Sequence, residues 1–123
     1  MSKQKVEDVN FGPDAGINFE RDTGTDSSQA ITQGARTGVV TSSTTNLGTD
    51  TSEKITITNR HCKAESVVLA NADGGGAGSP AVTKVTPKDG SIEITVRNVD
   101  ASNACDAAYK VQYVIFGDQS VQG

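Results

Sequence analysis

The stretch from residue 91 to residue 98, Ser-Ile-Glu-Ile-Thr-Val-Arg-Asn, decides the fold class of this chain. Its two isoleucines and its valine alternate with polar residues, and successive side chains of a β-strand point to opposite faces. The stretch therefore predicts a strand with one buried face. Residues 53–59, Glu-Lys-Ile-Thr-Ile-Thr-Asn, repeat the alternation and predict a second strand of the same kind.

Other parts of the chain carry weaker strand patterns, which are separated by residues that favour turns. No stretch of ten or more residues has the period of a helix, so we expect an all-β fold, a single β-sandwich or jelly-roll-like domain. Further strands are expected at residues 31–41, 66–71, 80–85 and 108–116, with a polar connection or weak edge strand at 42–51.

The expected last strand is apolar on parts of both faces. Val111, Tyr113 and Ile115 share one side, while Val114 and Phe116 share the other side with polar residues. Such a strand suits the centre of a sheet or a contact with a partner.

The front of the chain differs from the rest, because its apolar residues are scattered among charges and turn formers without a sustained period. We expect an extended N-terminal arm at residues 1–29, a β-sandwich domain at residues 30–117 and a short C-terminal tail at residues 118–123. A disordered tail is the alternative interpretation of the arm.

The arm holds two of the three phenylalanines of the chain. A tail without a partner has little use for such side chains, which contribute strongly to binding when they are buried. We therefore predict that Phe11, Ile17 and Phe19 bind a neighbouring subunit.

The composition indicates a thin hydrophobic core. The 123 residues suffice for one domain, but only 34% are hydrophobic and 4% are aromatic, so oligomerisation or attachment to a larger surface is expected to add stability. The net charge of −4 argues against nucleic-acid binding. No apolar run approaches the ~20 residues that span a bilayer, and no apolar signal core follows the N-terminus, so we expect neither a membrane partner nor classical export.

Few residues could carry chemistry. His61 precedes Cys62, but adjacent side chains of an extended segment point in opposite directions, which disfavours a Cys-His nucleophile. A structural zinc site needs four ligands, and only His61, Cys62 and Cys105 are present. The two cysteines are expected to be free thiols, with a disulfide left open because both follow strands and could meet at one end of a sandwich.

Two loop segments are candidate ligand sites. Asp100 and Asp106 flank a loop that could share a calcium ion, but the spacing of known calcium loops is missing. The run Asp-Gly-Gly-Gly-Ala-Gly-Ser at residues 73–79 lacks the Gly-Lys-Ser/Thr ending of a phosphate loop, and flexibility is the simpler explanation. We therefore predict no enzyme, no catalytic residues, no cofactor and no metal.

Five strand motifs follow one another along the chain: Thr37-Gly38-Val39, Ile55-Thr56-Ile57-Thr58-Asn59, Ser66 to Leu69, Gly90 to Asn98 and Tyr109 to Phe116. Their order resembles a group of short virion domains of tailed bacteriophages, especially marine and cyanobacterial ones. The resemblance covers residues 31–117 and rests on order and spacing, since no single motif is specific. This chain departs from the group at its two cysteines and in its acidic arm.

The resemblance implies a structural protein, commonly trimeric, with no catalytic residues to carry over. Because one short domain with one arm suits a cement protein, we expect a capsid decoration protein on the capsid surface of the virion. It would bind the major capsid protein, with its arm over neighbouring capsid subunits, and stabilise the shell by bridging subunits as a homo-trimer. The alternative is a tail or head fibre module whose loops at 73–79 and 100–106 contact a host receptor.

Overall fold

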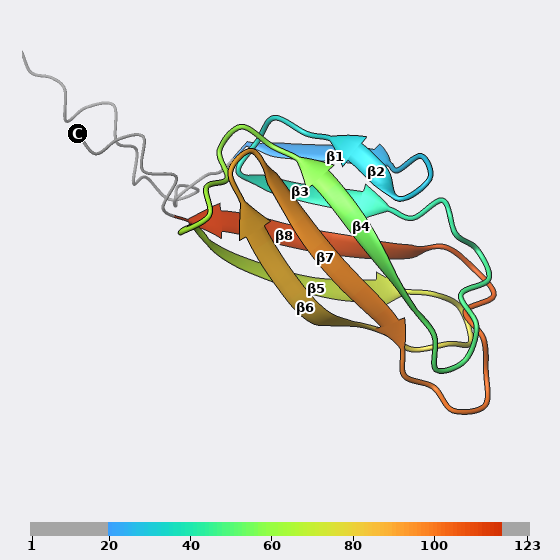
Figure 1. Cartoon of the computed structure of the whole chain (residues 1–123). Helices are drawn as coiled ribbons and strands as arrows, with labels where there is room; N and C mark the ends of the chain where they lie inside the picture. The colour runs from blue at the N-terminus through green and yellow to red at the C-terminus, as the bar shows by residue number, and fades with distance from the viewer. Residues whose placement is uncertain (1–19, 117–123) are drawn as a thin grey trace, which may run out of the picture.

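The computed structural model of the chain describes residues 20–116, which form eight strands in two packed four-stranded sheets (Figure 1). Sheet A has the strand order β1-β3-β8-β5 and sheet B has the order β2-β4-β7-β6. The predicted all-β sandwich is confirmed. The strands are β1 (Arg21–Thr25), β2 (Ala30–Thr32), β3 (Thr37–Thr41), β4 (Ser52–Thr58), β5 (Val67–Gly74), β6 (Pro80–Lys88), β7 (Ser91–Asn98) and β8 (Tyr109–Phe116).

The core lies between the sheets and is centred on the two strands with the clearest alternation. Strand β4 pairs antiparallel with β7, and Ile55 lies opposite Ile94. The inward isoleucines and valine of the two strands are fully buried, whereas the polar residues that alternate with them face away from the core. Sheet A contributes the inward residues of β8 and Val40 of β3. The alternation in the sequence therefore predicted the inner face of each of these strands correctly.

The start of the domain lies earlier than expected. Residues 21–25, which we expected to belong to the arm, form β1 and pair in parallel with β3. The expected single strand at 31–41 is two strands, because residues 33–36 cross between the sheets, so that β2 lies in sheet B and β3 in sheet A. Strand β2 pairs in parallel with β4. The segment from β1 to β2 therefore contributes one edge strand to each sheet.

Two buried asparagines hold the loops at opposite ends of the sandwich. Asn98, at the end of β7, donates to the carbonyl oxygens of Leu47 (3.2 Å) and Asn103 (3.0 Å) and accepts from the amide of Ser79 (2.9 Å). Asn59 donates to the carbonyl oxygen of Ala35 at 2.7 Å. Because buried polar groups are costly when they are unsatisfied, these bonds fix the loops firmly.

The turn between β6 and β7 uses the glycine that the sequence places there. Gly90 has φ of +85°, a conformation that glycine adopts without the steric cost of a side chain. The nearby Pro87 lies before the turn, in β6 opposite Ile92. No cis peptide bond occurs in the described part of the chain.

Candidate interaction surface

The outer face of sheet A changes from apolar to polar along the strands. At one end Val67 of β5 lies opposite Phe116 of β8, and in the next outward-facing row Leu69 lies opposite Val114. Val67 and Leu69 are each 58% exposed and Phe116 is 43% exposed. We call these four residues the apolar patch. Exposed apolar side chains that gather in this way are typical of interaction sites, whereas single ones are common on any protein.

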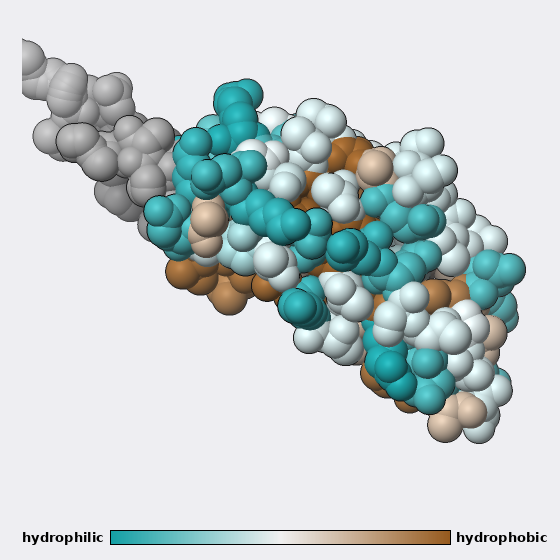
Figure 2. Space-filling model, in the orientation of Figure 1, coloured by the Kyte–Doolittle hydropathy of each residue, from teal (hydrophilic) through white to brown (hydrophobic). Residues whose placement is uncertain are grey.

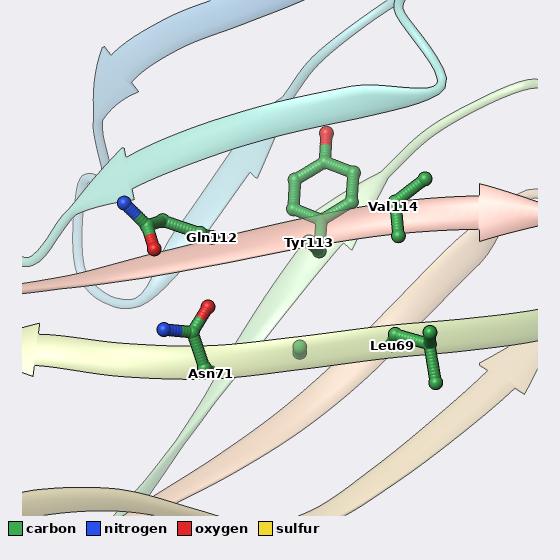
Figure 3. Close-up of a pocket in the computed structure, with 6 residues that line it drawn as sticks. Leu69, Asn71, Gln112, Tyr113 and Val114 are labelled. Atoms are coloured by element: carbon green, nitrogen blue, oxygen red, sulfur yellow. The ribbon is translucent and has the colours of Figure 1, made fainter.

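The other half of the same face is polar. Beyond the apolar patch, Asn71 lies opposite Gln112, and Asp73 lies opposite Lys110. Figure 3 shows this change along the two strands, with Leu69 beside Val114 at one side and Asn71 beside Gln112 at the other. The amide pair therefore forms the boundary of the apolar patch.

Two shallow hollows lie on this face and meet at β8. One, of about 310 Å³, is lined by Leu69 and Val114 together with Asn71 and Gln112. The other, of about 570 Å³, extends towards β1 and is lined by Arg21, Thr37 and Val39. Gln112 and Tyr113 line both hollows, so a single extended ligand could cross the face from β1 to β5.

The outer face of sheet B is polar and carries ion pairs. Glu93 of β7 accepts hydrogen bonds from Lys88 (2.9 Å) and Lys54 (3.4 Å). The hydrogen bond from Lys88 makes the largest contribution and lowers the pKa of Glu93. Burial opposes it, and the positive charges of Lys54 and Lys88 lower the pKa further, so that the net shift is downward. Arg97 pairs with Asp50 on the same face. Figure 2, which views the molecule from this side, shows mainly hydrophilic and neutral residues, with hydrophobic residues visible between them and along the rim where β5 begins and β8 ends.

The two tyrosines of β8 point inward and hold polar groups inside the sandwich. The Tyr113 hydroxyl donates to Gln33 Oε1 at 2.7 Å, and the Tyr109 hydroxyl donates to Glu53. Burial raises the pKa of Tyr113 to about 12. Burial and the adjacent Glu53 carboxylate raise the pKa of Tyr109 still further above its usual value. These hydroxyls therefore stay protonated at neutral pH and act as structural donors.

The cysteines are buried free thiols, as expected, and they are far apart. The Cys62 carbonyl accepts from the amide of Gly90, just before β7, whereas the Cys105 amide donates to Leu47 at the other end of β7. The eight residues of β7 separate them by roughly 24 Å. The open possibility that they meet at one end of the sandwich is therefore wrong. Burial also raises the pKa of both thiols, the opposite of what activates a cysteine nucleophile.

His61 and Asp100, the other candidates for catalysis or metal binding, have local structural roles. The His61 amide donates to Asn59 Oδ1 at 2.9 Å, within the turn that follows β4. Asp100 accepts from the amides of Ser102 and Asn103, both at 2.8 Å, and these bonds lower the pKa of Asp100. Within residues 20–116, no three or more His, Cys, Asp or Glu side chains are grouped so as to hold a metal ion.

The glycine-rich run is packed against its neighbour, which corrects the interpretation of its glycines as a source of flexibility alone. A Cβ atom on Gly78 would lie 2.6 Å from Cys105 Sγ and 2.7 Å from the Cys105 amide nitrogen. Gly76 has φ of +62°, and its neighbour Ala77 donates to Asp106 Oδ1 at 2.8 Å. The glycines are therefore required because the loop closes over the segment at 105–106.

The predicted partner-binding residues Phe11, Ile17 and Phe19 lie outside the described residues, as does the predicted tail at 118–123. The apolar patch includes Val114 and Phe116, which the two-faced last strand had indicated. It also includes Val67 and Leu69, whose role the sequence could not indicate. They belong to a continuous apolar run, Val67 to Ala70, whose outward members become clear only from the pairing with β8.

No helix long and apolar enough to cross a membrane occurs between residues 20 and 116. Comparison of the chain with protein-family models, with curated proteins and with solved structures found no match.

Proposed function

We propose that this protein is a capsid decoration protein of a tailed bacteriophage. It acts as a homo-oligomer, with a trimer as the expected form, and it binds the outer surface of the shell of major capsid protein. Its function is to bind: each oligomer bridges capsid subunits and resists the outward pressure of the packaged genome. The motif order described above supports this assignment.

The observation that carries the proposal is the one-sided surface of the sandwich. The outer face of sheet B is suited to water, whereas sheet A exposes Val67 and Leu69 next to Val114. Burial of apolar area is favourable by roughly 25 cal/mol per Å², so the apolar patch favours a partner that covers it. In the proposed function this patch holds the oligomer together, and the oligomer binds the shell through several weak contacts at once.

The chemical features of the domain are consistent with a binding role. The thiols are buried with raised pKa values, and the tyrosine hydroxyls are engaged with Gln33 and Glu53. Asp100 and Asp106 accept hydrogen bonds from loop amides. Each of these groups therefore has a structural role in the described domain.

The test is binding to empty shells assembled from the major capsid protein. Wild-type protein should saturate defined sites on the shell. The variant Leu69→Glu should bind with an apparent affinity lower by about tenfold or more, because it places a charge in the apolar patch and removes multivalent attachment. The matched control is Thr58→Glu, an exposed outward position of β4 in sheet B, which should bind normally.

Two results would contradict the proposal. Absence of wild-type binding to shells would exclude a decoration role. Equal loss of binding in Leu69→Glu and Thr58→Glu would show that the apolar patch has no special part in it.

A further inference from the structure

The apolar patch lies at the same end of sheet A at which the described chain begins. The Thr37 hydroxyl donates to the carbonyl oxygen of Glu20 at 2.6 Å, and Arg21 lies opposite Thr37. Thr37 in turn lies opposite Val114, which lies opposite Leu69. Arg21 therefore lies in the same row of the sheet as Leu69 and Val114, and the described chain begins one residue before it, at the edge formed by β1.

The residues that precede Glu20 match the chemistry of this face. Residues 6–19 include five large apolar residues and three acidic residues, and they contain no basic one. The hollow nearer β1 is lined by Arg21 and contains no carboxylate among its lining residues, and the hollow nearer β5 is lined by apolar and amide side chains. The apolar residues are Val6, Val9, Phe11, Ile17 and Phe19.

The direction of β1 favours the face of another copy over the chain's own face. From Arg21 to Thr25, β1 runs from the row of Leu69 and Val114 towards the row of Lys110. A chain that continues β1 backwards from Arg21 thus moves away from Leu69 and Val114, past the row of Val67 and Phe116, and leaves the end of the sheet. To cover its own face it would have to reverse at Glu20, whose carbonyl group Thr37 holds. Nineteen residues can extend over roughly 60 Å, which is enough to reach a second molecule.

We propose that residues 1–19 of one copy bind across the outer face of sheet A of a second copy, with Phe19 or its apolar neighbours covering Leu69 and Val114. The proposal rests on the proposed function, because it names the contact that builds the oligomer. The contact is heterologous, since residues 1–19 of each copy bind a different surface, the outer face of sheet A, on the next copy. Such contacts close into a ring when the rotation permits, which a trimer would satisfy.

Disulfide trapping between two full-length variants directly tests the contact between residues 1–19 of one copy and sheet A of another. One variant carries Phe19→Cys and the other carries Leu69→Cys, and the two are mixed and oxidised. The native thiols, Cys62 and Cys105, are fully buried and should not compete. The matched control replaces the second variant by Thr58→Cys on sheet B. A cross-linked pair containing one chain of each variant, formed with Leu69→Cys and not with Thr58→Cys, is the expected result.

The mass of the unmodified protein in solution gives a second, independent measurement. Light scattering should show an oligomer, and Leu69→Glu should raise its dissociation constant by about tenfold or more. The proposal is overturned if the unmodified protein is a monomer at all concentrations, or if cross-linking is the same with the control. It is also overturned if a disulfide forms only within single chains of a Phe19→Cys/Leu69→Cys double variant, which would place the arm on its own domain.

These outcomes separate the arm exchange from the proposed function. If inter-chain cross-links form but the protein does not bind capsid shells, the contact between residues 1–19 and a second copy is supported and the decoration role is contradicted. Shell binding by a protein without inter-chain cross-links would do the reverse.

Discussion

The two sheets of this sandwich distribute their side chains in opposite ways. Sheet B is aliphatic inside, with Ile55 and Ile94 in the core, and charged outside, with Glu93 between two lysines. Sheet A places the tyrosines of β8 inside, where their hydroxyls have polar partners, and leaves valine, leucine and phenylalanine side chains outside. A sheet that faces water is expected to resemble sheet B. The difference supports the proposal that sheet A is the side that binds a protein partner.

The edges of the two sheets show the same contrast. Strand β6, an edge of sheet B, contains Pro80, Pro87 and a bulge between Val82 and Lys84, all of which discourage pairing with another strand. Strand β5, an edge of sheet A, has neither a proline nor a bulge in its pairing with β8. Sheet B is thus protected against association, and sheet A is less so.

The largest expected effect comes from truncating an inward residue of sheet B. Ile94→Ala should lower the free energy of unfolding by about 2–5 kcal/mol, because Ile94 is fully buried and truncation leaves a cavity. Leu69→Ala, outside sheet A, should change it by less than about 0.5 kcal/mol, as exposed positions usually do. Urea unfolding of both variants at a concentration where the protein is monomeric checks the comparison.

A large effect of Leu69→Ala under these conditions would break the comparison. It would mean that the outer face of sheet A is already covered within one molecule. The apolar patch would then belong to the core of the protein.

An intermediate effect is expected from the inward side of sheet A. Tyr113→Phe removes the donor to Gln33 Oε1 inside the sandwich and should cost about 1–3 kcal/mol in unfolding experiments. Tyrosine ionises near 10 when unfolded, and the pKa of Tyr113 is about 12 in the folded protein. Its contribution should therefore be complete below pH 10 and decline as the pH rises from 10 to 12, and the decline should be shallower in Tyr113→Phe. Titration of Tyr113 near pH 10 in the folded protein, followed by absorbance at 295 nm, would contradict this.

The smallest effect is expected outside sheet B. Because Lys88 donates the hydrogen bond that contributes most to the lowered pKa of Glu93, Lys88→Ala should raise that pKa more than Lys54→Ala. A carboxylate with a lowered pKa stabilises the fold above its unfolded pKa, and the stabilisation is lost as the pH falls through the folded value. Titration of the Glu93 carboxyl by NMR measures both shifts, and the reverse order of the two variants would refute the assignment.

Most strands could be predicted because the alternation of their apolar and polar residues is visible in the sequence alone. The pattern of residues 91–98 coincides with β7, and the pattern of residues 53–59 lies within one residue of β4. Strand β1 could not be predicted in this way. Its residues, Arg-Asp-Thr-Gly-Thr, contain no large apolar side chain, and they form a strand because β3 offers a parallel partner.

The apolar patch was half accessible to sequence reasoning. The last strand showed Val114 and Phe116 on the side opposite its core residues, which indicated a partner. Val67 and Leu69 join them only through the pairing of β5 with β8, and a register shifted by one residue would have placed them inside. The packed glycine loop was missed for a similar reason, since the contact of Gly78 with Cys105 joins segments that are distant in the sequence.

The parallel pairing of β1 with β3 has a mechanical consequence. Tension applied at Glu20 along the direction of β1 would load the hydrogen bonds of all five paired residues together, in shear, and would not peel them apart one by one. A strand attached in this way resists pulling better than one opened from its end. If residues 1–19 carry force between neighbouring copies, as proposed, the short ladder at the edge of sheet A is where that force is transmitted to the domain.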